Sequence, residues 1–250
     1  MSIGRAVEAQ APAPERLIAH HVLGRWIGAT VVAEAIGFAA AMAIGRGVYA
    51  AIGGEPTGLA GEALTIGLSL LVGAVEGACL GTGQWRVLRH VLPEVRAGVW
   101  ILATATGGAL AWVLGMSAGP RVHPFSPGGT ALVLVASGLL LGGVLGGAQA
   151  LALRHRRRLA CAWVLASAIG WMLGLLFAYT GVAALPDEGL TPSALILLGV
   201  AGAAMAVQPS LATGLVLRRA MESSLQAVSS STEAARGPDD DLRGQRHRSR

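Results

Sequence analysis

Charge is scarce in this chain, and lysine is missing altogether. Only 13% of the residues are charged, and all 19 basic residues are arginines. Soluble domains of ordinary composition carry about twice that charged fraction. Without lysine, the chain has no group for a retinal or pyridoxal Schiff base and none for the phosphate-binding loop of nucleotide hydrolases. An Arg-only composition rich in Ala and Gly is typical of a GC-rich bacterial genome.

Patterns for a cofactor, metal or catalytic site are also missing. Cys79 and Cys161 are the only cysteines, and they lack the Cys or His neighbours of a metal site, so we expect buried, unpaired thiols. The segment 115–119 (GMSAG) matches Gly-x-Ser-x-Gly, but a nucleophile elbow follows a strand and requires a histidine partner. Here an apolar helical segment precedes it, and the last two apolar segments contain no histidine. We therefore predict no cofactor, no metal site and no catalytic residue.

Apolar residues dominate instead. They make up 53% of the chain, the mean hydropathy is +0.59, and there are 36 glycines. A chain of this length folded in water could not bury so much apolar surface, whereas a bilayer accommodates it, and a membrane-spanning helix needs about 20 mostly apolar residues. Six segments qualify: 24–45, 62–84, 97–117, 130–153, 160–184 and 193–217. The sequence therefore predicts an all-α, polytopic membrane helix bundle of about six transmembrane helices, with the lipid bilayer as its partner.

The arginines predict the orientation of this bundle. They cluster before the first segment, between the second and third, between the fourth and fifth, and after the sixth, whereas the other loops hold only Arg46 and Arg121. By the positive-inside rule, both termini then lie in the cytoplasm of a cell whose plasma (inner) membrane holds the protein. Four tryptophans fall close to the Arg-rich loops, where we expect an aromatic belt at the membrane interface. They are Trp26, Trp85, Trp100 and Trp163.

Polar segments flank the bundle. We divide the chain into a cytoplasmic N-terminal segment (1–21), the transmembrane bundle (22–219) and a cytoplasmic tail (220–250). The tail is Ser-rich and then charged, so it buries too little apolar area to fold, and we expect it to be disordered. The sequence pI of about 10.5 reflects the loops and the tail, and we predict no nucleic-acid partner.

Two stretches of the chain resemble each other. The segment 80–89 (LGTGQWRVLR) is answered by 145–154 (LGGAQALALR), and each is followed by a helix that begins with Trp100 or Trp163. Residues 26–30 and 214–218 give weaker third copies of the two parts. The sequence thus predicts three repeated helical hairpins, and we expect Gln84 and Gln149 to pack or cap between the repeats.

These motifs carry a resemblance to a known group of proteins. The pattern Gly-x-x-Gln-Trp/Ala-x-x-Leu-Arg, followed by Trp-Val-Leu-Ala-Ser-Ala-Ile-Gly-Trp, is similar to uncharacterised bacterial multi-pass membrane proteins with tandem two-helix repeats. The likeness covers residues 80–180 best. It implies an architecture and carries no activity, cofactor or site residue with it.

Three polar residues are expected near the middle of the membrane: Glu34, Glu76 and Gln208. Each lies 9 or 10 residues from the nearest arginine that flanks its segment. At 1.5 Å per residue, this is roughly 14–15 Å into a core of about 30 Å. Polar groups are expensive there and mark candidate sites for a substrate or an ion. Two carboxylates at one depth would share a proton, and Pro209 frees a backbone carbonyl beside Gln208.

Two functions remain open at this point. The first is a small-solute or ion transporter or channel that uses Glu34, Glu76 and Gln208. The alternative is a non-catalytic membrane scaffold or accessory subunit that binds an unidentified protein partner through its cytoplasmic loops or tail. The opposite reading of the two glutamates is that each is hydrogen-bonded and fixes helix packing. The sequence says nothing about the substrate or the oligomeric state.

Overall fold

The computed structural model describes residues 14–54, 57–118, 127–183 and 191–235, and every regular element among them is a helix. The six helices are α1 (Pro14–Ala51), α2 (Gly58–Val91), α3 (Ala97–Ala118), α4 (Pro127–Ala152), α5 (Arg157–Ala183) and α6 (Pro192–Ala235). Each is long and apolar enough to cross a membrane. The predicted all-α bundle of six transmembrane helices is thereby confirmed.

The ends of the long helices differ from the expected boundaries. α1 begins at Pro14, inside the predicted N-terminal segment, and proline is well suited to the first turn of a helix because it has no N–H there to leave unpaired. α6 continues to Ala235, so the part of the expected tail from 220 to 235 is helical. Its Ala, Leu, Glu and Gln residues favour a helix by their intrinsic propensity. Residues 1–13 and 236–250 lie outside the described part of the chain.

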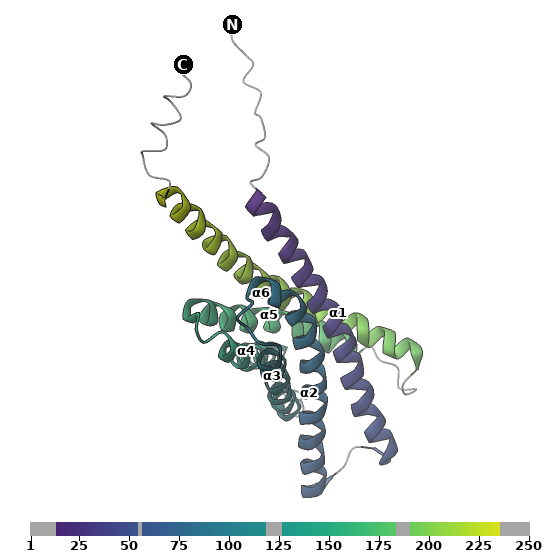
Figure 1. Cartoon of the computed structure of the whole chain (residues 1–250). Helices are drawn as coiled ribbons and strands as arrows, with labels where there is room; N and C mark the ends of the chain where they lie inside the picture. The colour runs from purple at the N-terminus through teal and green to yellow at the C-terminus, as the bar shows by residue number, and fades with distance from the viewer. Residues whose placement is uncertain (1–13, 55–56, 119–126, 184–190, 236–250) are drawn as a thin grey trace, which may run out of the picture.

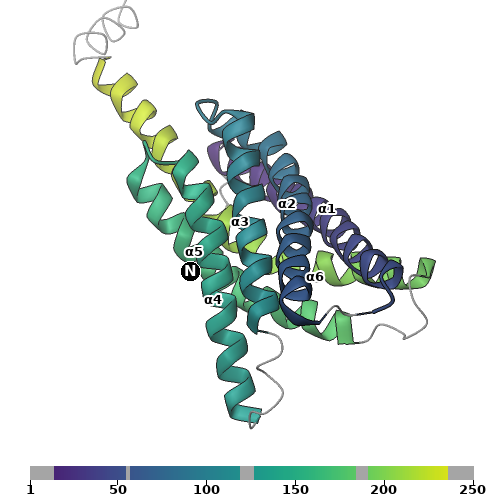
Figure 2. The same cartoon turned by 90° about the horizontal axis from the view of Figure 1, so that it is seen from below.

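The helices form a closed ring. Each helix packs against the next one in the chain, and α6 packs against α1 to close the circle. Figure 2 shows α4 and α5 on one side of the bundle and α1 and α2 on the other, with α3 between them. The beginning of α1 and the end of α6 extend beyond the other helices on the same side (Figure 1). Loops 92–96 and 153–156 lie at the end of the ring that holds most arginines, which we call the Arg-rich end.

Glycines set the close approach of α2 to α3. Gly73, Gly77 and Gly81 recur every four residues and therefore lie along one face of α2. A Cβ atom on Gly77 would lie 2.5 Å from the carbonyl oxygen of Thr104, and one on Gly73 would lie equally close to that of Gly108. Such backbone contact is how small residues hold membrane helices together when lipid removes the hydrophobic driving force.

The same spacing recurs in two other helix pairs. Gly138, Gly142 and Gly146 of α4 face α5, where a Cβ on Gly142 would lie 2.5 Å from the carbonyl oxygen of Ser167. On α6, Gly202 faces α1, and Ala206 and Ser210 follow it at four-residue steps, both fully buried. Small residues thus line the α2–α3, α4–α5 and α6–α1 pairs alike.

Three tryptophans fill the ring at the Arg-rich end. Trp100 and Trp163 lie in the first two turns of α3 and α5, whereas Trp26 lies about three turns into α1. All three are completely buried. The ring of Trp163 meets the other two edge-on, at centroid distances of 5.4 Å and 5.6 Å. The expectation that they form an aromatic belt at the interface is therefore wrong for these three, because their helices turn this face inward. Trp85 is only partly buried, and the Arg89 guanidinium lies 5.3 Å from its ring centroid.

The outward surface of the ring is apolar. Large aliphatic side chains stand exposed on several helices; the most exposed include Val32, Ile36, Leu102, Leu132, Leu165 and Ile196. Soluble monomeric proteins rarely expose so many large apolar side chains. Together with the six spans, this surface identifies an integral membrane protein in contact with lipid.

Candidate functional site

Glu34 has the most completely buried ionisable side chain among the described residues. It lies on α1, near the middle of the apolar segment His20–Ala51, and its exposed fraction is 0%. Neither carboxylate oxygen accepts a hydrogen bond from an N–H or hydroxyl group of the described residues. A buried carboxylate without partners costs several kcal/mol, so this group is not explained by local packing.

Glu76 reaches the same region from α2. Its Oε2 atom accepts a hydrogen bond from Trp112 Nε1 of α3, at 2.6 Å. Gly37 allows α1 and α2 to come together here, because a Cβ on Gly37 would lie only 3.1 Å from the Glu76 carbonyl oxygen. The Glu34 and Glu76 carboxyl groups are consequently close enough for a side-chain hydrogen bond.

This pair of carboxyl groups has a simple chemical property. Two ionised carboxylates have no hydrogen to place between them, so a hydrogen bond between Glu34 and Glu76 forms only when one of them carries a proton. Two unit charges about 4 Å apart repel by roughly 4 kcal/mol at an effective dielectric constant of about 20. The pair can therefore take up and release a proton, or exchange it for another small cation.

Gln208, the third residue singled out in the sequence, is placed differently. In the orientation that satisfies its hydrogen bonding, its amide donates to the carbonyl oxygens of Ala204 (2.9 Å) and Met205 (3.1 Å) on its own helix. Pro209 has no N–H, so the Met205 carbonyl four residues earlier loses its usual helical partner. The side-chain amide of Gln208 donates to this carbonyl oxygen instead. The structure thus brings Glu34 and Glu76 together and uses the Gln208 amide within α6.

A second group of polar side chains lies inside the Arg-rich end. Gln149 of α4 donates from Nε2 to Gln84 Oε1 of α2 (2.9 Å) and to Thr104 Oγ1 of α3 (3.2 Å). Its Oε1 accepts from Trp163 Nε1 of α5, at 2.8 Å. All four residues are buried. This network ties four helices together, so Gln84 and Gln149 pack between the helix pairs as expected.

The other two buried tryptophans differ in their partners. Trp26 Nε1 donates to Thr213 Oγ1 of α6 at 3.1 Å. Trp100 Nε1 is buried and has no partner in the described part of the chain, and the same holds for the hydroxyl of Thr30. Sequence reading placed these tryptophans at the membrane surface and did not single out Thr30. The signal was present, since a hydroxyl residue follows each tryptophan by four positions: Thr30, Thr104 and Ser167.

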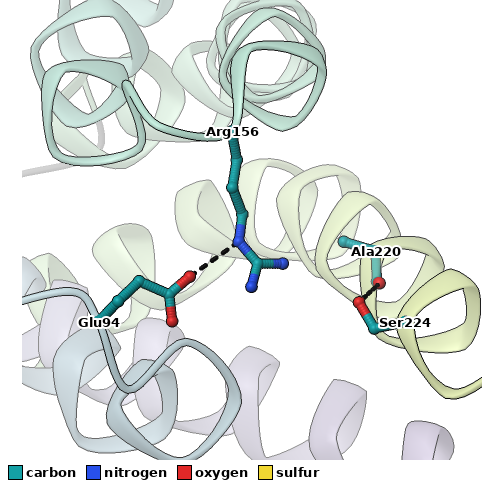
Figure 3. A network of polar contacts seen from close by, with 4 residues as sticks. All are labelled: Glu94, Arg156, Ala220 and Ser224. Atoms are coloured by element: carbon teal, nitrogen blue, oxygen red, sulfur yellow. Dashed lines mark hydrogen bonds and ion pairs between the residues drawn. The ribbon is translucent and has the colours of Figure 1, made fainter. Parts of the chain in front are cut away.

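An ion pair links the loops outside this network. Arg156 Nε lies 2.8 Å from Glu94 Oε1, which joins the α4–α5 loop to the α2–α3 loop (Figure 3). Both side chains are nearly half exposed, so the pair contributes at most about 1 kcal/mol. It is a surface contact and not part of the buried site.

The two cysteines differ in their exposure. Cys161 is exposed on the surface of α5, so the expectation of a buried thiol is wrong there, while Cys79 is partly buried on α2. Within the described residues, no three His, Cys, Asp or Glu side chains gather as a metal site would require.

Comparisons of the chain with protein-family models, with curated proteins and with solved structures found no match.

Proposed function

We propose that this protein is a transporter for a small cation, with the proton as the first candidate, and that Glu34 and Glu76 form its binding site. The observation that carries the proposal is the Glu34 carboxyl group, which is fully buried in mid-membrane without a hydrogen-bond donor and faces a second carboxyl group. Intramembrane ionisable groups of this kind form proton relays in pumps and transporters.

Proton or cation flux through purified protein in liposomes tests the proposal. The vesicles enclose a pH-sensitive dye, and flux is measured under an imposed potential. We expect Glu34→Gln to abolish the proton flux of the wild type, because the amide cannot take up a proton. Glu62→Gln is the matched control, since Glu62 lies on α2 but is exposed. Flux that is unchanged in both Glu34→Gln and Glu76→Gln would refute the proposal.

The thermal stability of the same variants separates transport from packing. Only the Glu76 carboxyl group can share a hydrogen bond with Glu34, and a glutamine amide can still donate to it, so we expect Glu34→Gln to be as stable in detergent as the wild type, or more so. Large losses of stability in both Glu→Gln variants would indicate that the two carboxyl groups hold the helices together, and the transport proposal would then lose its main support.

Orientation and repeat architecture complete the proposal. The arginines favour an Arg-rich end that faces the cytoplasm of the inner membrane, with both termini on that side. The recurring small-residue contacts of α2–α3, α4–α5 and α6–α1 support three copies of one hairpin, the third split between the two ends of the chain. The likeness to bacterial multi-pass proteins with tandem two-helix repeats is part of the same proposal.

The second candidate function is a scaffold or accessory subunit. The observation that favours it is the extension of α6 to Ala235, where the helix projects beyond the ring (Figure 1). Such an arm offers a surface to a protein partner. Purification from native membranes in mild detergent should then yield a stable partner that is lost when the chain is truncated after Met221. A chain that purifies alone from native membranes contradicts this function.

A further inference from the structure

The buried polar groups of the ring are not confined to Glu34 and Glu76. They continue along α1 toward the Arg-rich end, where Thr30 lies one helical turn from Glu34 on the same face and Trp26 one turn further. Each step of four residues corresponds to a rise of about 6 Å. Glu34, Thr30 and Trp26 are all buried. A column of polar groups therefore leads from the carboxyl pair to the tryptophans.

Polar atoms without a partner among the described residues occur in this column and in the group of tryptophans at its end, to which Trp100 belongs through its contact with Trp163. Thr30 Oγ1 and Trp100 Nε1 are buried without a hydrogen-bond partner among the described residues, as are both oxygens of Glu34. Leaving a buried donor or acceptor unpaired costs about 1–3 kcal/mol each. Thr104, the counterpart of Thr30 on α3, instead donates to the Trp100 carbonyl oxygen (2.8 Å) and accepts from Gln149. The hydroxyl of α3 is thus satisfied by the protein, whereas that of α1 is not.

Water is the ligand that fits such a set. It donates and accepts hydrogen bonds, and a buried water typically makes about three of them to groups left unpaired by the protein. The Trp100 indole N–H can donate a hydrogen bond to water, the Thr30 hydroxyl can donate or accept one, and the Glu34 carboxyl oxygens can accept one. An anion would face the Glu34 carboxylate, and an apolar ligand would leave every one of these groups unpaired.

We infer that the Trp100 indole N–H and the Thr30 hydroxyl bind buried water on the Arg-rich side of Glu34, and that this water carries protons between that side and the carboxyl pair. The transport half of this inference rests on the proposed function, whereas the water site stands on the unpaired atoms alone. In each transfer, a water gives a proton to the Glu34 carboxylate and receives one from the next water toward the Arg-rich end. One O–H bond breaks as each new one forms, so no other reactant is needed.

The packed tryptophans control access to this water. The ring of Trp163 contacts those of Trp26 and Trp100 edge-on, and all three rings are fully buried. They therefore lie between Thr30 and the Arg-rich surface. The Gln149 network fixes Trp163 by its indole N–H. Protons consequently pass only when this contact loosens or through water held beside the rings.

The hydration of Trp100 can be measured without any transport. The six tryptophans give separate indole N–H signals in the NMR spectrum of 15N-Trp-labelled protein in micelles, and Trp→Phe variants assign them. Trp26 and Trp163 are the matched controls, because they are equally buried but bonded to Thr213 and Gln149. We expect a magnetisation-transfer peak between water and the Trp100 N–H, and none for the other two. A Trp100 signal that is as isolated from water as that of Trp26 overturns the inference.

Flux measurements test the role of the water. We expect Thr30→Val to lower proton flux at least tenfold and Thr30→Ser to retain it, because serine keeps the hydroxyl. Thr106→Val is the control, since Thr106 is exposed on α3. Wild-type flux in Thr30→Val refutes the proton path. If the wild type moves no protons while Trp100 contacts water, the proposed function fails and the water site is supported.

Discussion

Adding one methyl group at Gly142 should weaken the α4–α5 contact, whereas the same change one residue later should not. A Cβ on Gly142 would lie 2.5 Å from the Ser167 carbonyl oxygen and 2.8 Å from the Cα of Ala168. Ordinary contacts between such atoms begin near 3.4 Å, so the two helices must separate by up to about 0.9 Å. Gly143 has nothing within 4 Å of its Cβ position.

The expected magnitude follows from two opposing effects. Overpacking a close contact costs about 1–3 kcal/mol, while replacing glycine by alanine within a helix gains up to about 1 kcal/mol. We therefore expect Gly142→Ala to lower the free energy of unfolding by about 1–2 kcal/mol. Gly143→Ala should leave it unchanged or raise it by up to about 1 kcal/mol, because only the second effect operates there.

Equilibrium unfolding in mixed micelles, followed by tryptophan fluorescence as SDS replaces a mild detergent, measures both variants against the wild type. The α2–α3 pair offers an independent repeat of the experiment. A Cβ on Gly77 would lie 2.5 Å from the Thr104 carbonyl oxygen, whereas Gly67 has open space. Equal losses of stability in Gly142→Ala and Gly143→Ala, or no loss in either, would show that close backbone contact does not hold these helices together.

Two further predictions concern single polar contacts. Gln208→Leu should lower the free energy of unfolding by about 1 kcal/mol in the wild type, because it leaves the Met205 carbonyl oxygen without a donor. In a Pro209→Ala background the loss should be small, because residue 209 regains its N–H. The same unfolding assay measures this double-mutant cycle, and additive losses would contradict the assignment. Arg156→Ala should change the free energy of unfolding by less than about 1 kcal/mol, because its ion pair with Glu94 is nearly half exposed. The change should be smaller still at high salt, which screens the pair. A loss of several kcal/mol would mean that this loop contact holds the ring closed.

Much of this fold follows from the sequence because lipid imposes a strong constraint on it. Every backbone polar group in the hydrocarbon must be paired within its own segment, so long apolar stretches become helices. For α3, α4 and α5 the expected bounds agree with the observed ones to within a few residues. Hydropathy cannot locate the end of α6 at Ala235, however, because the helix continues beyond the apolar segment through a polar stretch whose Ala, Leu, Glu and Gln residues favour a helix.

The direction in which a side chain points is what the sequence left open. Trp26, Trp100 and Trp163 have the depth expected of interface residues, yet they face inward because their helices pack on small-residue partners. Gln208 has the depth of a site residue, but the missing N–H of Pro209 gives its amide a partner on its own helix. The depth of a residue in the membrane depends only on its position along one helix. The direction of its side chain depends on how the six helices pack into the ring.

The candidate site lies where the three helix pairs cease to be alike. Counted from the buried tryptophans, Glu34 occupies the position held by Gly108 on α3 and Trp171 on α5. Glu76 likewise stands where the other two small-residue helices have Leu141 and Met205. The shared small-residue spacing accounts for the packing of all three pairs, so packing alone gives no reason why α6–α1 and α2–α3 each carry a buried carboxyl group while α4–α5 carries none. Local departures from an otherwise consistent design are where functional residues are expected. This asymmetry favours a role for Glu34 and Glu76 in binding and not in assembly of the ring.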